Sequence, residues 1–312
     1  MNKSLTFAAA ILASVALAGP AGLGADAAHQ HNEFLQFASA NNKHYSTTRE
    51  LYRRERIWKH NKDQVDALNA EANGKATFAM NKFSDMTTAE KASYKGISQT
   101  RERESEEKHA GHGLPTGLTG RPPNPKGVGL LGTDINWMDR GHVHPVKDQG
   151  WCGSCWAFAA AGVIESRVSI AATEANGGEL VAPVRLSEQT GVDCIQGNTC
   201  DQGGFHDDYY WFAMEYGVNT EADYPYTGTD DDCAHDDSKP LTWVDDWFDV
   251  LDGGGKVADI RAALETGPLS IDVAASSATF ENYSSGVITS DMSCPGARRN
   301  IDHGIFLVGY EV

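Results

Sequence analysis

The chain has 312 residues, of which 40% are apolar and 22% charged, a composition that excludes an intrinsically disordered protein. At roughly 150 residues per domain, this length suggests about two domains. The net charge of −17 is uneven: residues 131–312 carry 30 acidic and 9 basic side chains, whereas residues 1–130 carry 13 acidic and 17 basic ones. The acidic half argues against nucleic acid as a partner, because phosphate would be repelled. The opposite signs suggest that the two halves attract each other, although an acidic surface alone also favours solubility.

The first residues predict a secretory signal peptide. Lys3 precedes an uncharged apolar run at residues 5–17, and small residues at 16–18 and 25–27 offer two cleavage sites. The run is shorter than the ~20 apolar residues that span a membrane, and we expect no membrane span elsewhere. We therefore expect the signal peptide to be residues 1–27, or 1–18 with the earlier site. The mature protein would follow the secretory route to an extracellular, lysosomal or vacuolar location, where cysteines can pair.

A helical stripe of mixed polarity comes next. Six side chains recur at intervals of three or four residues, which places them on one face of an α-helix; they are Glu50, Arg54, Trp58, Asn61, Val65 and Asn69. A stripe that only packed against a core would be mostly apolar, so the pattern indicates a more specific role. Residues 78–85 then alternate like a strand, and a short helix is expected after Thr87.

Residues 100–130 differ in composition from what surrounds them. A dense run of mixed charge is followed by a stretch rich in Gly and Pro, which cannot bury enough apolar surface to fold. We expect an exposed linker that proteases can cut. It separates a small helical domain at 28–99 from a globular domain at 131–312. In the latter, helical patterns precede strand patterns, which predicts an α+β fold with two lobes.

Residues 149–158 read QGWCGSCWAF and admit three kinds of chemistry. The C-x-x-C pair could be a thioredoxin-like redox motif, but the preceding residues, with a proline, do not resemble the buried strand of a βαβ unit. A zinc site needs four ligands, and the remaining cysteines form no second C-x-x-C pair. The third possibility is a nucleophile, because Cys155 would begin a helix, whose dipole lowers the pKa of a thiol.

The nucleophile hypothesis accounts for two further residues. His303 lies at the start of an apolar, strand-like run and could both pair with a thiolate and protonate a leaving amine. By itself, a histidine before a strand is more often structural. Gln149 could donate its side-chain amide, beside the backbone N–H of Cys155, to a developing oxyanion.

Together these residues resemble the papain-like cysteine proteases, over a range from about residue 32 to 312. The segment at 149–158 is similar to the active-site segment of that family, and Asp302, His303 and Gly304 to its catalytic histidine segment. Gly203 and Gly204 resemble the glycine pair that lines the substrate site. The stripe resembles the ERFNIN-type pattern of the inhibitory propeptide, and Asn81, Phe83 and Asp85 its second motif, although Ala79 stands where Gly is usual. These propeptide motifs favour the cathepsin L-like branch.

The resemblance implies a papain-like α+β fold with a helical lobe, a β-rich lobe and an active-site cleft between them. It implies a cysteine endopeptidase made as a zymogen, without cofactor or metal and monomeric, whose partners are protein substrates and its own propeptide. The alternative is a non-catalytic secreted homologue or a propeptide-type inhibitor of other cysteine proteases. Because carboxylates protonate at low pH, we expect acid to weaken the attraction between the basic propeptide and the acidic enzyme.

The resemblance also implies the cysteine pairing. Cys155 stays free, Cys152 pairs with Cys200, and Cys194 with Cys233, which leaves Cys294 without a partner. In the family that cysteine pairs beyond the catalytic histidine, where an orienting Asn also lies. Since residue 312 is only nine residues after His303, we expect the natural protein to continue beyond this sequence.

Three smaller sets of residues also carry expectations. By resemblance, Asp272 and Asp302 belong to the substrate-binding region, and Asp272 would favour Lys or Arg at the second substrate subsite. Asn282 begins a glycosylation sequon. His142, His144 and His206 are expected to be surface or structural residues.

Overall fold

The structure is a computed structural model that describes residues 25–97, 134–239, 242–250, 256–289, 292 and 300–311. The whole expected linker at 100–130 and residues 1–24 of the expected signal peptide lie outside the described residues. The chain divides into two compact units, Met1–Asp66 with Met80–Met86, and Ala67–Ala79 with Thr87–Val312.

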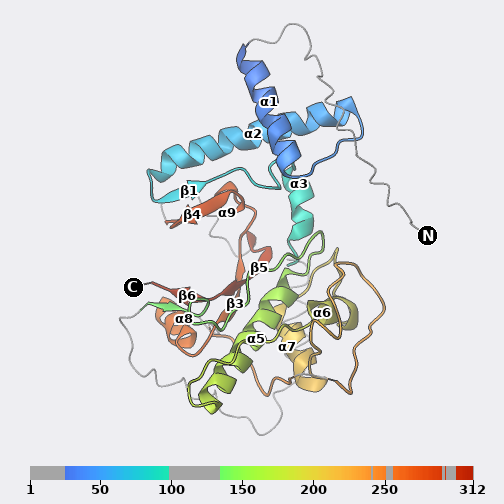
Figure 1. The fold of residues 1–312 in the computed structure, drawn as a ribbon, viewed down its shortest axis with the longest axis vertical. Helices are drawn as coiled ribbons and strands as arrows, with labels where there is room; N and C mark the ends of the chain where they lie inside the picture. Colours follow the sequence, from blue (N-terminus) through green and yellow to red (C-terminus); the bar gives the residue numbers. More distant parts are fainter. Residues whose placement is uncertain are drawn as a thin grey trace, which may run out of the picture. The chain divides into compact units, whose positions relative to one another are not determined.

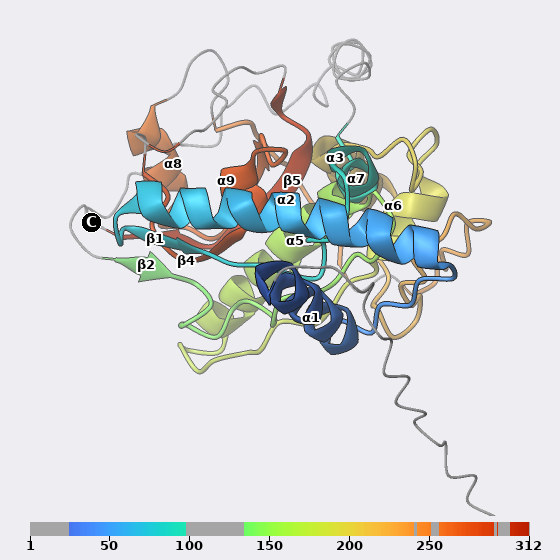
Figure 2. The same cartoon turned by 90° about the horizontal axis from the view of Figure 1, so that it is seen from above.

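The first unit is built on two helices, α1 (Ala25–Ala40) and α2 (Thr48–Ala72), which cross in Figure 1 and lie beside each other in Figure 2. Phe34 is fully buried and Trp58 nearly so, with ring centroids 5.9 Å apart. Phe37 packs on the same indole at 6.0 Å. Trp58, one of the two apolar members of the stripe, therefore holds the two helices together through aromatic contact.

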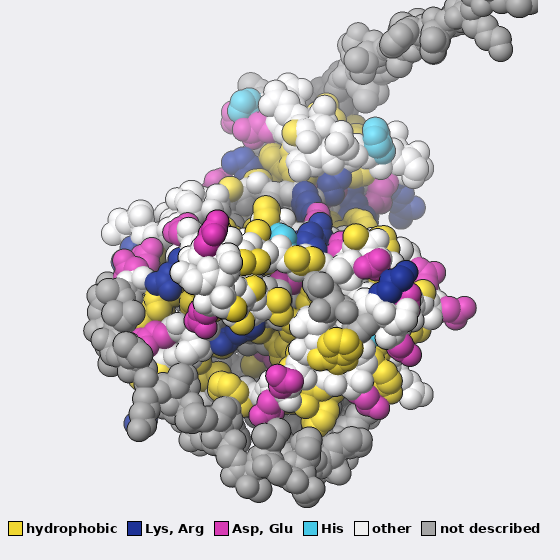
Figure 3. All heavy atoms as spheres, turned by 60° about the horizontal axis from the view of Figure 1, so that its bottom comes forward, with side chains coloured by type: hydrophobic (Ala, Val, Ile, Leu, Met, Phe, Trp, Pro, Cys, Tyr) yellow, Lys and Arg dark blue, Asp and Glu magenta, His cyan; other side chains and the backbone are white. Residues whose placement is uncertain are grey.

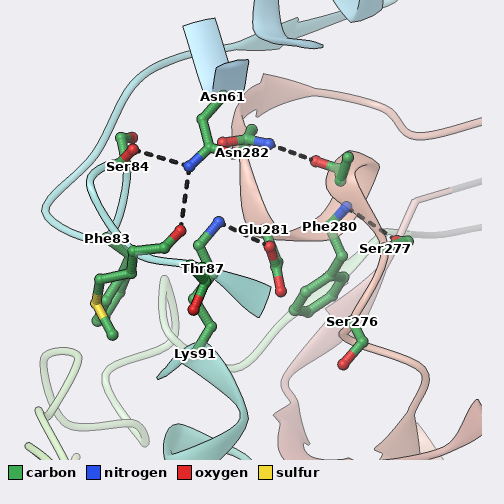
Figure 4. A network of polar contacts seen from close by, with 12 residues as sticks. Asn61, Phe83, Ser84, Thr87, Lys91, Ser276, Ser277, Phe280, Glu281 and Asn282 are labelled. Atoms are coloured by element: carbon green, nitrogen blue, oxygen red, sulfur yellow. Dashed lines mark hydrogen bonds and ion pairs between the residues drawn. The ribbon is translucent and has the colours of Figure 1, made fainter. Parts of the chain in front are cut away.

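The polar members of the stripe bind the chain that returns along α2. Arg54 donates to Glu50 at 2.6 Å and to the carbonyl oxygen of Asp85 at 3.0 Å. Asn61 donates to the carbonyl oxygens of Ser84 and Met86 at 2.8 and 3.2 Å, as Figure 4 shows for Ser84. Backbone acceptors left without strand partners are thus satisfied by side chains.

The second propeptide motif forms the turn that these side chains hold. Asn81 accepts from the backbone N–H of Phe83 at 3.0 Å. Asp85 is buried, and its carboxylate accepts a hydrogen bond from the hydroxyl of Tyr45 at 3.0 Å. The ammonium group of Lys43 pairs with the same carboxylate at 2.9 Å. Each polar residue of the two motifs therefore has a structural task, which explains why the stripe is not apolar.

In the second unit, the end of α2 positions a short strand, β1 (Ala76–Phe78). Asn69 donates to the carbonyl oxygen of Phe78 at 2.8 Å and accepts from its N–H at 2.9 Å. β1 pairs antiparallel with β4 (Tyr283–Gly286), beside it in Figure 2. α3 (Thr88–Lys91) follows, begun by Thr87 in a capping box with Glu90, and then the 3-10 turn η1 (Ala92–Tyr94).

The core of the second unit surrounds α5 (Cys155–Ala175). This helix lies between α6 (Glu188–Cys194) and α7 (His206–Glu215) on one side and β3 (Leu269–Val273) and β5 (His303–Leu307) on the other (Figure 1). Ser187 caps α6, because its hydroxyl accepts from the backbone N–H of Thr190 at 3.1 Å. The buried core comprises Trp156, Ala157, Ala160, Ala161, Ile164, Leu186, Tyr209, Tyr210, Ala213 and Val218. α5 is apolar and long enough to cross a membrane, but it is mostly buried inside this core.

Three two-stranded ladders occur among the described residues. β3 pairs antiparallel with β5, which sets Asp272 opposite Gly304 and Val273 opposite His303. β2 (Ile135–Asn136) pairs with β6 (Gly309–Tyr310), against which α8 (Val257–Leu264) packs. α9 (Ala278–Glu281) precedes β4. The β3–β5 register matters for function, because it places Asp272 and Gly304 opposite each other near the first turn of α5.

Candidate active site

Cys155 is the first residue of α5, and its side chain is buried. Ser154 precedes it as the N-cap but makes no side-chain capping bond. Its hydroxyl lies instead 2.6 Å from the hydroxyl of Tyr226, which donates to the carbonyl oxygen of Gln149 at 2.7 Å. Tyr226 thereby fixes the loop that leads to the helix, a role that the sequence motif did not indicate.

A segment from the N-terminal half of the chain covers the thiol. The N–H of Gly96 lies 3.3 Å from Sγ of Cys155, and Gly204 donates its N–H to the carbonyl oxygen of Gly96 at 2.8 Å. Ile97 donates to the carbonyl oxygen of Asp302 at 3.3 Å. We call residues 94–97 the covering segment. Its backbone bonds occupy the places that the resemblance assigns to a peptide substrate.

Gln149 also contacts the covering segment. Its side-chain amide donates to the carbonyl oxygen of Tyr94 at 3.0 Å and to that of Cys152 at 2.8 Å. The ring of Tyr94 packs on Trp151 with centroids 4.6 Å apart. The amide of Gln149 therefore donates to a carbonyl oxygen of the same segment whose Gly96 contacts the thiol.

The β3–β5 ladder brings the start of β5, where His303 lies, to the thiol. The N–H of its neighbour Gly304 lies 3.3 Å from Sγ of Cys155. The Nδ1 atom of His303 is buried and has no hydrogen-bond partner among the described residues. Burial lowers the pKa of His303 to about 4, partly opposed by Asp302 and reinforced by Lys95. The ring is thus neutral while the covering segment is in place.

Burial acts on the thiol in the same sense. It raises the pKa of Cys155 to about 11, and the backbone donors of Gly304 and Gly96 only partly oppose this effect. Taking a charge out of water disfavours the ionised form of both groups. The covered site therefore holds a neutral thiol and a neutral imidazole, which is a resting state and not a reactive ion pair.

Two lysines, one at the end of α3 and one in the covering segment, pair with the same carboxylate of α9. We call residues 88–97, which hold both lysines, the covering region. Lys91 and Lys95 lie 2.9 and 2.7 Å from the two oxygens of Glu281, and the three side chains are only 9–13% exposed. Lys95 also donates to Ser276 at 2.7 Å. Figure 4 shows Lys91 directed at Glu281 from α3. Pairing of this kind anchors the covering region to the domain that carries Cys155.

Two disulfides join the pairs that the resemblance implies. Cys152 is bonded to Cys200, whose carbonyl oxygen also accepts from Gly153 at 2.8 Å. Cys194 is bonded to Cys233. Cys155 is a free thiol, and Cys294 lies outside the described residues. The first disulfide fixes the loop directly before the reactive cysteine.

The structure places Asp272 and Asp302 near the thiol in different roles. The carboxylate of Asp302 accepts from the N–H of Ala275 at 2.7 Å and from the hydroxyl of Ser276, so it supports the backbone. Asp272 bonds His206 at 2.8 Å. The expectation that His206 is an incidental surface or structural residue misses this pairing, because Asp272 is 66 residues away in the chain.

The glycosylation sequon is not supported by the structure. Asn282 is only 2% exposed, and its side-chain amide donates to the carbonyl oxygen of Ala278 at 2.9 Å (Figure 4). Its own carbonyl oxygen accepts from Ala79 next to the β1–β4 ladder. A glycan cannot be attached to a buried amide in this conformation. Among the described residues, no group of three His, Cys, Asp or Glu side chains is placed to hold a metal ion.

Comparison with known proteins gives the class to which this site belongs. Residues 131–312 match the family described as papain family cysteine protease, and residues 34–90 match the cathepsin propeptide inhibitor domain. The chain belongs to the papain family of cysteine proteases and carries a cathepsin-type inhibitory propeptide. It is thus a cathepsin L-like zymogen of a cysteine endopeptidase.

Individual relatives agree with this assignment. Procathepsin L of Felis catus is 32% identical over 84% of this chain and 72% of its own length, and cathepsin K of Mus musculus is 31% identical over 86% and 76%. Cysteine protease 1 of Oryza sativa is 35% identical, but the match spans only 49% of its length. Digestive procathepsin L 3 of Tenebrio molitor has the same fold, with a TM-score of 0.68 and 28% identity over 90% of this chain and 84% of its own. The papain-like α+β fold predicted from the sequence is thereby confirmed.

Proposed function

We propose that Cys155 and His303 are the catalytic pair of this endopeptidase. Once the covering segment leaves, the thiolate of Cys155 attacks the carbonyl carbon of a peptide bond. His303 gives a proton to the amine as the C–N bond breaks, and the acyl group stays on sulfur as a thioester. His303 then takes a proton from water as the water oxygen attacks the thioester carbon, and the C–S bond breaks, which releases the acid and restores the thiolate. The position of Cys155 at a helix N-terminus favours its thiolate.

The neighbouring groups receive distinct tasks in this mechanism. Gln149 and the backbone N–H of Cys155 stabilise the oxyanion, for which one such donor is worth roughly 3 kcal/mol in other enzymes. Gly203 and Gly204 hold the substrate backbone, and Asp302 accepts a backbone N–H from it. The observation that carries the proposal is the covering segment itself, which bonds Gln149, Gly204 and Asp302 around the thiol.

We propose that acid releases this inhibition and that cutting within residues 100–130 completes it. Protonation of carboxylates weakens the attraction between the basic N-terminal part and the acidic remainder. On the face drawn in Figure 3, acidic side chains are scattered singly or in small groups. The domains follow as signal peptide 1–27, propeptide 28–99, linker 100–130 and peptidase 131–312.

Incubation at pH 4–5 tests this function. The purified chain should be cut within the linker and should then hydrolyse a fluorogenic peptide, whereas Cys155→Ser and His303→Ala should give no hydrolysis. A matched serine substitution at a disulfide cysteine is avoided, because it would alter folding. If the wild-type chain is cut but hydrolyses no more peptide than Cys155→Ser, the proposal is wrong and a non-catalytic inhibitor is favoured.

The cellular setting is inferred from the same features. Two disulfides in a small domain favour the secretory route, ending outside the cell or in a lysosome or vacuole. The burial of α5 in the core supports a protein that does not cross a membrane by this helix. We further propose that it acts as a monomer on protein substrates, with its own propeptide as the inhibitor.

A further inference from the structure

His206, the first residue of α7, is held between two acceptors beside the catalytic cysteine. Its Nδ1 lies 3.1 Å from the carbonyl oxygen of Trp156, the residue after Cys155, and its Nε2 lies 2.8 Å from a carboxylate oxygen of Asp272. A neutral imidazole donates from only one nitrogen. Because a carbonyl oxygen and a carboxylate both accept, this geometry requires the ring to donate twice, so His206 is an imidazolium.

The electrostatic surroundings of His206 agree with this geometry. Burial, with only 12% of the side chain exposed, and the helix N-terminus both disfavour a cation there. Burial lowers the pKa of His206, but the bond to Asp272 and the charges of Asp272 and Asp207 more than offset that effect, and the net direction is upward. The charge on His206 thus depends on Asp272.

The pair lies beside the reacting atoms. Asp272 is opposite Gly304 in the β3–β5 ladder, and the N–H of Gly304 is 3.3 Å from Sγ of Cys155. A Cβ atom on Gly304 would come within 2.6 Å of Cε1 of His206. Asp272 remains 36% exposed, so its carboxylate is open to a neighbouring ligand. The pair therefore lies beside the backbone N–H that contacts the reactive thiol.

We propose that His206 and Asp272 together set the charge preference of the substrate site, and that His206 acts as the switch. While His206 is an imidazolium, the pair is neutral overall and the site takes an uncharged substrate side chain. When His206 loses its proton, the charge of Asp272 is uncompensated, and the site favours Lys or Arg. This inference rests on the proposed peptidase function, and it makes the preference expected from Asp272 alone conditional on pH.

Other titratable groups also face His206 and have to be considered. They are Asp207 on its own helix α7, Asp272 on β3 and His303 on β5. Changes at Cys155 or His303 alter the turnover of all substrates together. The ratio of two substrates therefore isolates the His206–Asp272 pair from the catalytic pair.

The test compares two peptides that differ only in Leu or Arg at the subsite next to Asp272, on the acid-released enzyme between pH 4.5 and 8. The ratio of kcat/KM for Arg over Leu should rise with pH by about fivefold, the size of one partly exposed charge pair. His206→Gln should show the high ratio throughout, and Asp272→Asn a low one throughout. His142→Gln, a buried histidine bonded to Ser169 elsewhere, should behave as wild type.

The outcomes separate this inference from the proposed function. If the wild type cleaves neither peptide, the peptidase function is at fault. If it cleaves both but the ratio is flat with pH and unchanged in His206→Gln, the inference is wrong. Should His206→Gln fail to fold, an NMR titration of the wild-type and Asp272→Asn proteins decides, because the His206 pKa must fall when Asp272 is removed. An unchanged pKa would overturn the pairing.

Discussion

Cys155 and His303 show how strongly burial controls chemistry at a single residue. With the covering segment in place, the pKa of the thiol rises to about 11 and that of the imidazole falls to about 4. Both shifts favour the neutral form, so the covered site favours a neutral thiol and a neutral imidazole over the thiolate–imidazolium pair. Inhibition therefore involves the protonation state of the pair in addition to the physical block.

Glu188 gives a prediction at the same scale, for stability. It is fully buried with Lys147 at 2.5 Å, and burial raises its pKa from 4.5 to about 7 despite that lysine. Since the folded pKa exceeds the unfolded one, the native state binds more protons between pH 4.5 and 7. The free energy of unfolding should thus fall by roughly 3 kcal/mol as pH rises through this window.

Denaturant unfolding of the whole chain at pH 5, 6 and 7 measures this effect. Glu188→Gln should remove most of the slope, because the amide does not titrate. Glu179→Gln, a change at an exposed position, should keep the wild-type slope. Equal slopes in wild type and Glu188→Gln would show that Glu188 is ionised at all three pH values.

At the scale of elements, the covering segment depends on close backbone approach. A Cβ atom on Gly96 would lie 1.8 Å from the carbonyl oxygen of Gly153, and one on Gly203 would lie 1.6 Å from that of Gly96. Gly96→Ala should therefore displace the segment at a cost of about 1–3 kcal/mol, which weakens inhibition about 5- to 150-fold. Peptide hydrolysis by the chain before acid treatment is the readout, with Ser93→Ala as the control. Equal inhibition in Gly96→Ala and wild type would contradict this account.

The anchoring of α3 and η1 on α9 makes a second prediction for elements. Glu281→Gln removes the charge that Lys91 and Lys95 share and leaves two largely buried ammonium groups unpaired. Breaking a buried pair costs more than breaking an exposed one, so acid activation at a given pH should become roughly tenfold faster or more. The fraction of active enzyme against time at several pH values measures this. Glu179→Gln should activate as wild type does, and a normal rate in Glu281→Gln would exclude the anchor.

For the whole molecule, the sequence predicted those features that local spacing encodes. The stripe from Glu50 to Asn69 follows from helical periodicity, and the segment around Cys155 from a motif with several fixed positions. The fold class followed from the order of helical and strand patterns. In each case the residues that form the feature are close together in the chain.

Features that join distant segments could not be predicted in this way. The pairing of His206 with Asp272 depends on how α7 and β3 both pack on α5, and that of Lys95 with Glu281 spans 186 residues. The sequon at Asn282 gives no sign that the amide is buried beside β4. Such contacts are set by tertiary packing, which leaves no periodic pattern in the sequence.

The rate at which iodoacetamide alkylates Cys155 at pH 5.5 tests the central claim most directly. The intact chain should react slowly, as a buried neutral thiol does. After acid release, the same cysteine should react at least tenfold faster, because a thiolate stabilised by His303 persists where ordinary thiols are protonated, and His303→Ala should lose that gain. Slow alkylation of Cys155 after the covering segment has been removed, or equal rates in wild type and His303→Ala, would contradict the account.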